Sequence, residues 1–463
     1  MPRIPNLVGA NTSEARFPTA YRVEEIALTM FNGSKVYDIQ ALVTDFTIIE
    51  SLYTPAVQLS LNVKDDIDFM GQARLSGQEK IQIKVVKKPY TDGNGSGPVQ
   101  KIDLAFYVTE YPVYGRQNNL IQAYTIRGVT KHAYVSKLKR VSRAVSGKIG
   151  DIVKSICTKD LGIPANMLDI SERASASINA VIPNLEPIDA IYWLIKRAFT
   201  DTGSPFYFYQ SVDGKVYLKS QEELVSTSQV FEDYSESKFF SKDPESNPAD
   251  AYNEVVTRIL SLNSTINLGK PLSASGGAFA SKTYYVDLPS KSISQKDFSY
   301  KQEQAKRVEQ KLYVTDKFKP EAGNDEASVQ SAVDLSKYDD ARHIVIPMNS
   351  MAYLNGANYN SSTSGGNLAK ASSYVELLDS MQHDLTIAGD MELTSGKIVK
   401  LKLPAPINPT LDRKDYTAAG PSNKEDLMLS GKYLVTAVQH NFGDEHTVEF
   451  RVKRDSAPSD IFS

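Results

Sequence analysis

The feature that most constrains the fold is a set of short segments, alternating between apolar and polar residues, that occurs near both ends of the chain. The first set includes residues 75–86, 106–113 and 120–127, and the second residues 393–404, 433–440 and 447–454. In both, a Ser-Gly turn, a lysine-rich strand, an insertion, a strand with a central Val-Thr, a hairpin and a strand that ends in a basic residue follow in that order. Such alternation is typical of half-buried strands. The pattern predicts two similar small antiparallel β-barrels, although two unrelated meanders would share part of this order.

Between these ends the pattern changes to the helical period. Residues 149–156 place four apolar side chains on one helix face, and Ser146 is the expected N-cap. A second helix is expected to begin at Pro187 and to stop near Gly203. Asp213-Gly214 lies between two strand-like runs and predicts a hairpin. We therefore expect a mainly β chain with an α+β middle region.

The remaining segments are polar and poor in pattern. Residues 91–98 read as a hairpin tip, and residues 261–283 and 318–373 as long loops, interrupted by strand-like islands at 251–260 and 341–348. The predicted organisation is an N-terminal arm (1–20), a first barrel (21–128), an α+β middle domain (129–250), a loop-rich segment that adds strands to its neighbours (251–375), a second barrel (376–455) and a C-terminal tail (456–463).

Charge and cysteine content exclude several classes of function. The chain has 463 residues and a net charge of −3, from 52 basic and 55 acidic residues, so no broad attraction to nucleic acid or anionic membrane is expected. Its single cysteine, Cys157, cannot form an intrachain disulfide and adjoins an apolar stripe, which favours a buried thiol. No apolar run is long enough to span a bilayer. A soluble protein is expected.

Two histidines are the only candidates for a metal site. His440 and His446 flank the turn sequence NFGDE and could approach each other across a hairpin. A third ligand is not evident, so surface histidines at the mouth of a hairpin are the more ordinary interpretation. No nucleophile elbow or phosphate loop occurs in the sequence. We expect no catalytic residue and no cofactor.

Aromatic residues and one outward strand face are candidates for subunit interfaces. Aromatic side chains in such places make either core or interface contacts. In the last strand Val448, Phe450 and Val452 alternate with polar residues, which leaves the polar side chains for solvent or a neighbouring barrel. The interface candidates are Trp193, Phe206, Phe208, Tyr433, Glu449 and Arg451.

The chain resembles the baseplate hub proteins of contractile phage tails, a family that includes the T-even hub subunit, late control protein D and the N-terminal part of type VI secretion tip proteins. The resemblance is carried by residues 77–86, by the block at 182–220, and by LTIAGDMELTSGKIVKLKLP and LSGKYLVTAVQHNFGDEHTVEFRVKRD near the end. It covers nearly the whole chain in the order of elements. The chain has no OB-fold or needle repeat after the second barrel and no lysozyme-like segment.

The resemblance implies a non-enzymatic virion protein, made in the host cytoplasm. Trimers with two barrels per chain would form a pseudo-sixfold ring that adapts the sixfold tail tube to a trimeric central spike. Implied partners are further copies of the chain, the spike, the tube or tube-initiator protein, the tape measure protein and wedge or sheath-initiator proteins. Genomic DNA would pass through the lumen without specific binding, and no membrane insertion is implied. The alternative from another class is a β-rich glycan- or receptor-binding virion protein.

Overall fold

The structure is a computed structural model. It describes residues 19–88, 99–235, 255–300, 342–348, 361–404 and 426–455, apart from residues 32, 34, 117–119, 175, 176, 199, 201, 227–229, 268–274, 278, 289 and 427 inside these ranges. The side chains of residues 346, 348 and 361–367 are also not described. The predicted hairpin tip at 91–98, residues 1–18 of the predicted arm (1–20), the tail at 456–463 and much of the loop at 318–373 lie outside the described residues.

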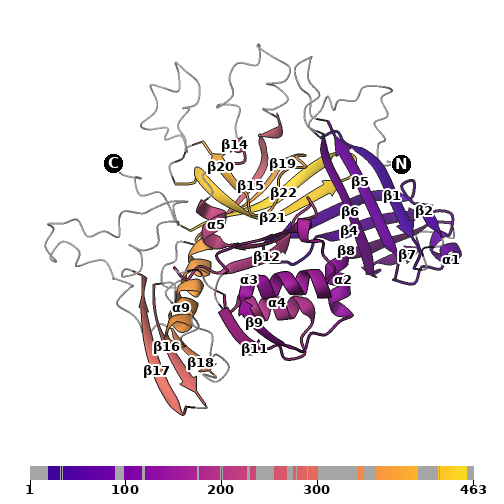
Figure 1. The fold of residues 1–463 in the computed structure, drawn as a ribbon. Coiled ribbons are helices and arrows are strands. Elements are labelled where there is room, and N and C mark those ends of the chain that lie inside the picture. The colour runs from indigo at the N-terminus through magenta and orange to yellow at the C-terminus, as the bar shows by residue number, and fades with distance from the viewer. Residues whose placement is uncertain are drawn as a thin grey trace, which may run out of the picture.

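Most of the strands join in one large sheet of the described chain (Figure 1), in the order β15-β19-β22-β21-β3-β4-β8-β6-β5-β1-β2. β14 and β20 pair beside β21, and β7 pairs with β8. The strands are β1 (Arg22–Thr29), β2 (Val36–Asp38), β3 (Val43–Ser51), β4 (Gln58–Asp65), β5 (Lys80–Lys87), β6 (Gln100–Glu110), β7 (Tyr114–Arg116), β8 (Gln122–Thr130), β14 (Asp233–Ser235), β15 (Ile259–Ile266), β19 (Met381–Ala388), β20 (Ile398–Lys402), β21 (Gly431–Phe442) and β22 (His446–Arg454). A short helix α1 (Phe69–Ala73) separates β4 from β5.

Two parts of this sheet have the same topology. In the N-terminal part the antiparallel order is β5-β6-β8-β4-β3, and in the C-terminal part it is β20-β21-β22-β19-β15. If the five strands of each part are numbered along the chain, their order across the sheet is three, four, five, two, one in both parts. We call these parts unit 1 (β3, β4, β5, β6, β8) and unit 2 (β15, β19, β20, β21, β22).

The β-bulges strengthen this equivalence. The first strand of each unit carries one extra residue, Thr44 in β3 and Leu260 in β15. The fourth strand also carries one, Thr109 in β6 and Thr436 in β21. Each of these two fourth-strand threonines donates a 3.2 Å hydrogen bond to the carbonyl of an arginine in the next strand. The central Val-Thr of the sequence repeat is therefore a bulge whose extra residue is held by its own side chain.

The bulges also correct the sequence alignment of the repeat. Residues 75–86 and 393–404 are aligned correctly, because Val108 N donates to Glu79 O and Val435 N donates to Lys397 O at equivalent places. The last strand is misaligned by three residues: the equivalent of Arg127 is Arg451, not Arg454. An odd shift exchanges the two faces of a strand, so the predicted match of terminal basic residues is wrong.

Each unit encloses its own apolar core. In unit 1, with β1 and α1, the alternate residues of every strand point into one cluster that includes Ile26, Phe46, Leu61, Ile83 and Phe106. In unit 2, with β14, a second cluster includes Tyr234, Leu385, Val399, Val438 and Phe450. The mainly β class is thus confirmed. The pairings among the described residues leave the sheets open, so closure of each unit into a barrel stays a prediction.

The middle region is α+β and has a third core. Its elements are α2 (Lys131–Lys137), β9 (Ala144–Lys148), α3 (Ile149–Ser155) continuing as the π-helical stretch η1 (Ile156–Asp160), the 3₁₀ turn η2 (Ala165–Met167), β10 (Leu168–Ile170), β11 (Ser177–Val181), α4 (Pro187–Ile195), β12 (Phe206–Gln210), β13 (Val216–Ser220) and α5 (Gln221–Ser226). The Asp213-Gly214 hairpin joins β12 and β13, with Gly214 at a φ of +82° that favours glycine.

Two details of the helix predictions are wrong. Ser146 does not cap a helix, because it lies in β9 and its hydroxyl donates a hydrogen bond to Asn179 across the β9–β11 pair. The helix that begins at Pro187 ends at Ile195, well before Gly203. Ser204 and Thr200 instead form a turn in which the backbone N–H of Ser204 donates to Thr200 Oγ1.

The region predicted as loop-rich contains the strand expected at 341–348 and further regular structure. β16 (Ala280–Asp287) pairs with β17 (Ser292–Ser299) and β18 (His343–Met348), and α9 (Ser361–Leu378) contacts this small sheet. Figure 1 shows the small sheet projecting from the body beside α9. Ala369, Tyr374 and Leu378 of α9 are buried. No helix within the described ranges is long and apolar enough to cross a membrane.

Candidate functional site

The two units meet along one backbone seam, formed by β3 of unit 1 and β21 of unit 2. Ala437–Phe442 pairs antiparallel with Phe46–Ser51. β21 is long enough to serve two neighbours on the same edge, because its first half pairs with β20 and its second half with β3. At one end of the seam the rings of Phe46 and Phe442 stack with centroids 4.7 Å apart. The two units therefore form one continuous sheet.

A ladder of polar side chains crosses the seam on the face opposite the cores. Asn441 lies at its centre: its Oδ1 accepts from Thr47 of β3 at 3.2 Å, and its Nδ2 donates to Glu449 of β22 at 3.1 Å. In unit 1, Asn62 donates to Asp45 at 2.6 Å and accepts from Thr125 at 2.7 Å. Cross-strand pairs of this kind stabilise a sheet and fix its register. The polar ladder consists of Thr125, Asn62, Asp45, Thr47, Asn441 and Glu449.

Glu50 ties three parts of the chain together on the buried side of the seam. Its carboxylate is fully buried and accepts hydrogen bonds from Ser211 Oγ at 2.9 Å and Val212 N at 2.5 Å, at the end of the β12–β13 hairpin. The other oxygen accepts from the backbone N–H of Ser395 and from its Oγ at 3.0 Å, in the loop before β20. Burial raises the pKa of Glu50 to about 7, and the four hydrogen bonds oppose that rise. Glu50 thus joins unit 1, the middle region and unit 2.

A buried lysine makes a second connection between the units. Lys87, at the end of β5, donates its ammonium to the carbonyl of Gly389, just after β19. Gln100 of β6 accepts from Met391 N at 3.2 Å and donates to Asp390 at 3.3 Å. Burial lowers the pKa of Lys87 to about 8, and the charge of Asp390 opposes this shift. The two connections hold the β19–β20 loop against unit 1 at its two ends, Gly389 after β19 and Ser395 before β20.

The two candidate metal ligands do come together, but inside the protein. His440 and His446 are fully buried, and their Nδ1 and Nε2 atoms lie 3.3 Å apart. The His446 ring stacks on Phe442 with centroids 4.3 Å apart. Burial lowers the pKa of His440 to about 4 and that of His446 well below its usual value. The interpretation as surface histidines is therefore wrong. Among the described residues no group of three or more His, Cys, Asp or Glu side chains could hold a metal ion.

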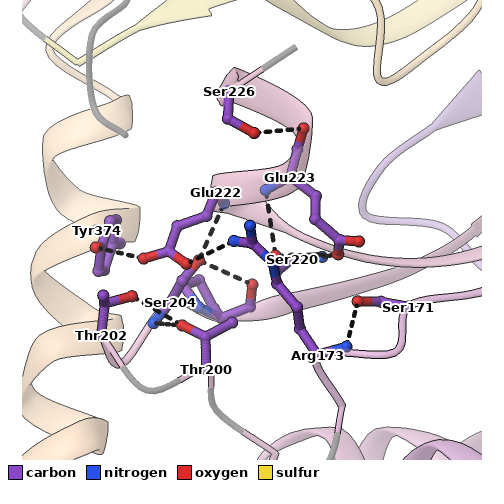
Figure 2. A network of polar contacts seen from close by, with 11 residues as sticks. Ser171, Arg173, Thr200, Thr202, Ser204, Ser220, Glu222, Glu223, Ser226 and Tyr374 are labelled. Carbon is purple, nitrogen blue, oxygen red and sulfur yellow. Dashed lines mark hydrogen bonds and ion pairs between the residues drawn. The ribbon is translucent and has the colours of Figure 1, made fainter. Parts of the chain in front are cut away.

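A polar cluster beside α5 fixes α9 to the middle region (Figure 2). The carboxylate of Glu222 is 3.3 Å from Arg173 Nη1 and accepts a 3.1 Å hydrogen bond from Tyr374 of α9. Its backbone N–H donates to Ser204 Oγ at 3.1 Å. Figure 2 shows these side chains converging from α5, α9 and the turn before β12. The partners of Glu222 come from three separate segments of the chain, so this cluster holds those segments together.

Three of the six predicted interface residues belong to the chain's own cores. Phe206 and Phe208 of β12 are buried in the middle core, and Tyr433 of β21 is buried in the core of unit 2. Tyr433 also bonds His383 through its hydroxyl at 2.9 Å. These side chains offer no surface to a partner, so for them the core alternative is the correct one.

The other three lie nearer the surface. Trp193 of α4 is half-buried, with the Arg197 guanidinium 4.0 Å from its ring centroid. Glu449 and Arg451 are exposed on the outward face of β22, where Arg451 pairs with Asp384 at 2.7 Å. Their role in an interface stays a prediction.

Sequence reasoning missed Glu50, although a signal was present. In β3 the alternation of Phe46 and Ile48 with polar residues puts Glu50 on the inward face. A carboxylate at an inward position of an alternating strand must find donors when it is buried. Its donors come from loops 161 and 345 residues away, and nothing in the sequence pairs them with it.

The fold is similar to those of known tail proteins. No protein-family model matches the sequence, and no curated protein matches it. The 43 kDa tail protein of prophage MuSo2 from Shewanella oneidensis aligns with a TM-score of 0.50 at 10% identity, over 94% of this chain and all of that one. A tail protein from Neisseria meningitidis MC58 gives 0.49 at 10% identity, over 95% and 98% of the two chains. The type VI secretion component c3393 of E. coli gives 0.43 at 9%, over 95% and 79%. On the alignment with the MuSo2 protein, the chain has a fold like that of a phage tail protein.

Proposed function

We propose that the chain is a structural, non-enzymatic baseplate hub subunit of a contractile phage tail. It would form a homotrimer that adapts the sixfold tail tube to a trimeric central spike. The observation that carries this proposal is the repeated topology: units 1 and 2 share one strand order and both bulges in their first and fourth strands. Two equivalent units in each of three chains supply six similar positions around one axis.

The junction of the units suits a part that transmits force. A seam of backbone hydrogen bonds, the polar ladder and the buried Glu50 hold unit 1 and unit 2 in one relative position. Six such positions form a regular ring only if the two units of each chain are rigidly related. Closure of each unit into a small barrel, with domains near 21–128 and 376–455, is part of the proposal.

The partners follow from the proposed role. A hub in the virion would contact the tube or its initiator on one face and the spike on the other, with tape measure and wedge or sheath-initiator proteins nearby. Genomic DNA would pass through the ring without specific binding. The polar ladder is a suitable lining for that passage, since its ionisable members Asp45 and Glu449 are acidic and would not hold phosphate.

The test is the state of assembly of the purified chain. Sedimentation and negative-stain electron microscopy should show trimeric rings with six peripheral lobes. A monomer at micromolar concentration, with and without a co-expressed spike protein, would contradict the proposal.

A further inference from the structure

The equivalence of units 1 and 2 implies a second seam like the one between β3 and β21. The two strands that would form it, β15 and β7, do not pair with each other within the described chain. In the seam, the first strand of unit 1 (β3) pairs with the second half of the fourth strand of unit 2 (β21). The equivalent pair exchanges the units: the first strand of unit 2 is β15, and the counterpart of the second half of β21 in unit 1 is β7. The equivalence of β7 with the second half of β21 follows from their partner strands. In unit 1, Tyr114 of β7 pairs with Tyr124 of β8, three residues before Arg127. In unit 2, His440 of β21 pairs with Val448 of β22, three residues before the equivalent Arg451.

β15 is a terminal strand of the large sheet. It pairs with β19 on one edge, and within the described ranges no strand forms a ladder with its other edge; the residue before it, Arg258, makes one isolated bridge to Ser235 of β14. Most of its residues are exposed, including Leu260 at 54% and Ile266 at 41%. An exposed edge strand of eight residues with apolar side chains is a template for pairing with another chain.

β7 presents a second edge of the same kind. It pairs with β8, and no other strand in the described part of the chain pairs with it. All three of its residues are exposed, and Tyr114 and the preceding Val113 are 50% and 59% exposed. Large exposed apolar side chains beside an unpaired edge indicate a covered surface in the assembled protein.

We propose that β15 of one copy pairs antiparallel with β7 of the next copy, which repeats between chains the β3–β21 seam within each chain. This inference rests on the proposed trimer and names its interface. The contact is heterologous, since two different edges meet, and such contacts close into a ring when the rotation allows it. Each chain supplies one internal seam and one external seam, so three chains close a ring in which no edge of this kind remains open.

The internal seam also supplies the register. The bulges align Thr47 with Asn263, because Thr44 and Leu260 are equivalent. The pairing of Thr47 with Asn441 in the internal seam then predicts that Asn263 lies opposite Gly115 of the next copy. A Cβ at Gly115 would meet nothing within 4 Å in the isolated chain, so a cysteine can be placed there.

The test is disulfide cross-linking of the full chain with Asn263→Cys and Gly115→Cys. The native Cys157 stays in place because its thiol is buried and burial raises its pKa to about 12. Mild oxidation should give covalent dimers and trimers on non-reducing gels. The control pair Ser264→Cys with Gly115→Cys should give about tenfold less, since neighbouring residues of a strand point to opposite faces.

The outcomes separate this interface from the proposed function. Cross-linked trimers from the first pair alone would support the β15–β7 seam. Trimers by sedimentation without cross-linking above the control would overturn the seam and leave the hub proposal standing. A monomer by sedimentation that does not cross-link would overturn both. As a second measurement, Thr265→Lys places a charge on the edge of β15 and should shift the chain from trimer to monomer while its circular dichroism is unchanged.

Discussion

Replacement of Glu50 tests whether the two units are held as one body. Glu50→Ala removes the acceptor of two buried backbone N–H groups, those of Val212 and Ser395. Each buried donor left without a partner costs about 1–3 kcal/mol, so the two backbone donors together cost about 2–6 kcal/mol. The loss should appear as easier opening of the β3–β21 seam.

Hydrogen exchange measured by mass spectrometry is the appropriate assay, because it reports local opening. Peptides that cover 46–51 and 437–442 should exchange faster in Glu50→Ala, by a factor of about a hundred or more. Glu79→Ala is the matched control: Glu79 is also fully buried and accepts several hydrogen bonds, from Ser76, Gly77 and Tyr111, all within unit 1 and its β6–β7 connection. Unchanged exchange at 437–442 in Glu50→Ala would refute the role given to Glu50.

The pH dependence gives an independent check. Burial raises the pKa of Glu50 to about 7 from 4.5, so between these values the native chain binds more protons than the unfolded chain. Stability therefore falls as the pH rises from 4.5 to 7, by up to about 3 kcal/mol from this one group. The effect is isolated by measuring hydrogen exchange at the β3–β21 seam against pH in the native chain and in Glu50→Gln, whose side chain cannot titrate. An identical pH dependence in both proteins would show that Glu50 does not titrate in this window.

Three further predictions concern other joints. Thr436→Val should lose about 1 kcal/mol in urea denaturation, because its buried hydroxyl loses the hydrogen bond to Arg451 O, and Thr109→Val should lose less, because Thr109 is exposed and water can replace its bond; no loss in Thr436→Val would argue against the role given to the bulge threonine. His440, with its pKa lowered to about 4 by burial, should remain neutral in NMR spectra at pH 5.5, and stability should fall as the pH drops from 6.5 to 4; a charged imidazole at pH 5.5 would contradict its burial. Tyr374→Phe removes a hydrogen bond to Glu222 and should speed proteolysis of α9 severalfold; an unchanged rate would show that this hydrogen bond does not hold α9 in place.

The strands with clear alternation could be predicted from the sequence, and so could their equivalence. Residues 75–86 and 393–404 align as the structure has them, since a lysine-rich strand after a turn is readable from local pattern. The last strand could not be aligned, because an extra residue in a bulge changes which residues share a face and leaves no mark in the hydrophobic pattern. The sequence shows the repeated Val-Thr pair, but it does not show that the threonine is the extra residue of a β-bulge.

The segments that were missed depend on tertiary contacts. β15 has mostly exposed residues, so its sequence has little of the alternation of a half-buried strand. α9 begins with Ser, Thr and Gly, which are poor helix formers, and its buried Ala369, Tyr374 and Leu378 stabilise it by packing. The same limit applies to Glu50 and to the histidine pair. Sequence can show that a polar side chain is placed inward, but not which distant loop supplies its partner.

The most direct test of the central claim is the mass and symmetry of the assembled chain. We predict a particle of three times the 51.1 kDa of one chain, with six similar lobes around a central opening in class averages of electron micrographs. A stable monomer, or a twofold particle without a central opening, would contradict the claim that two equivalent units in each chain build a pseudo-sixfold ring.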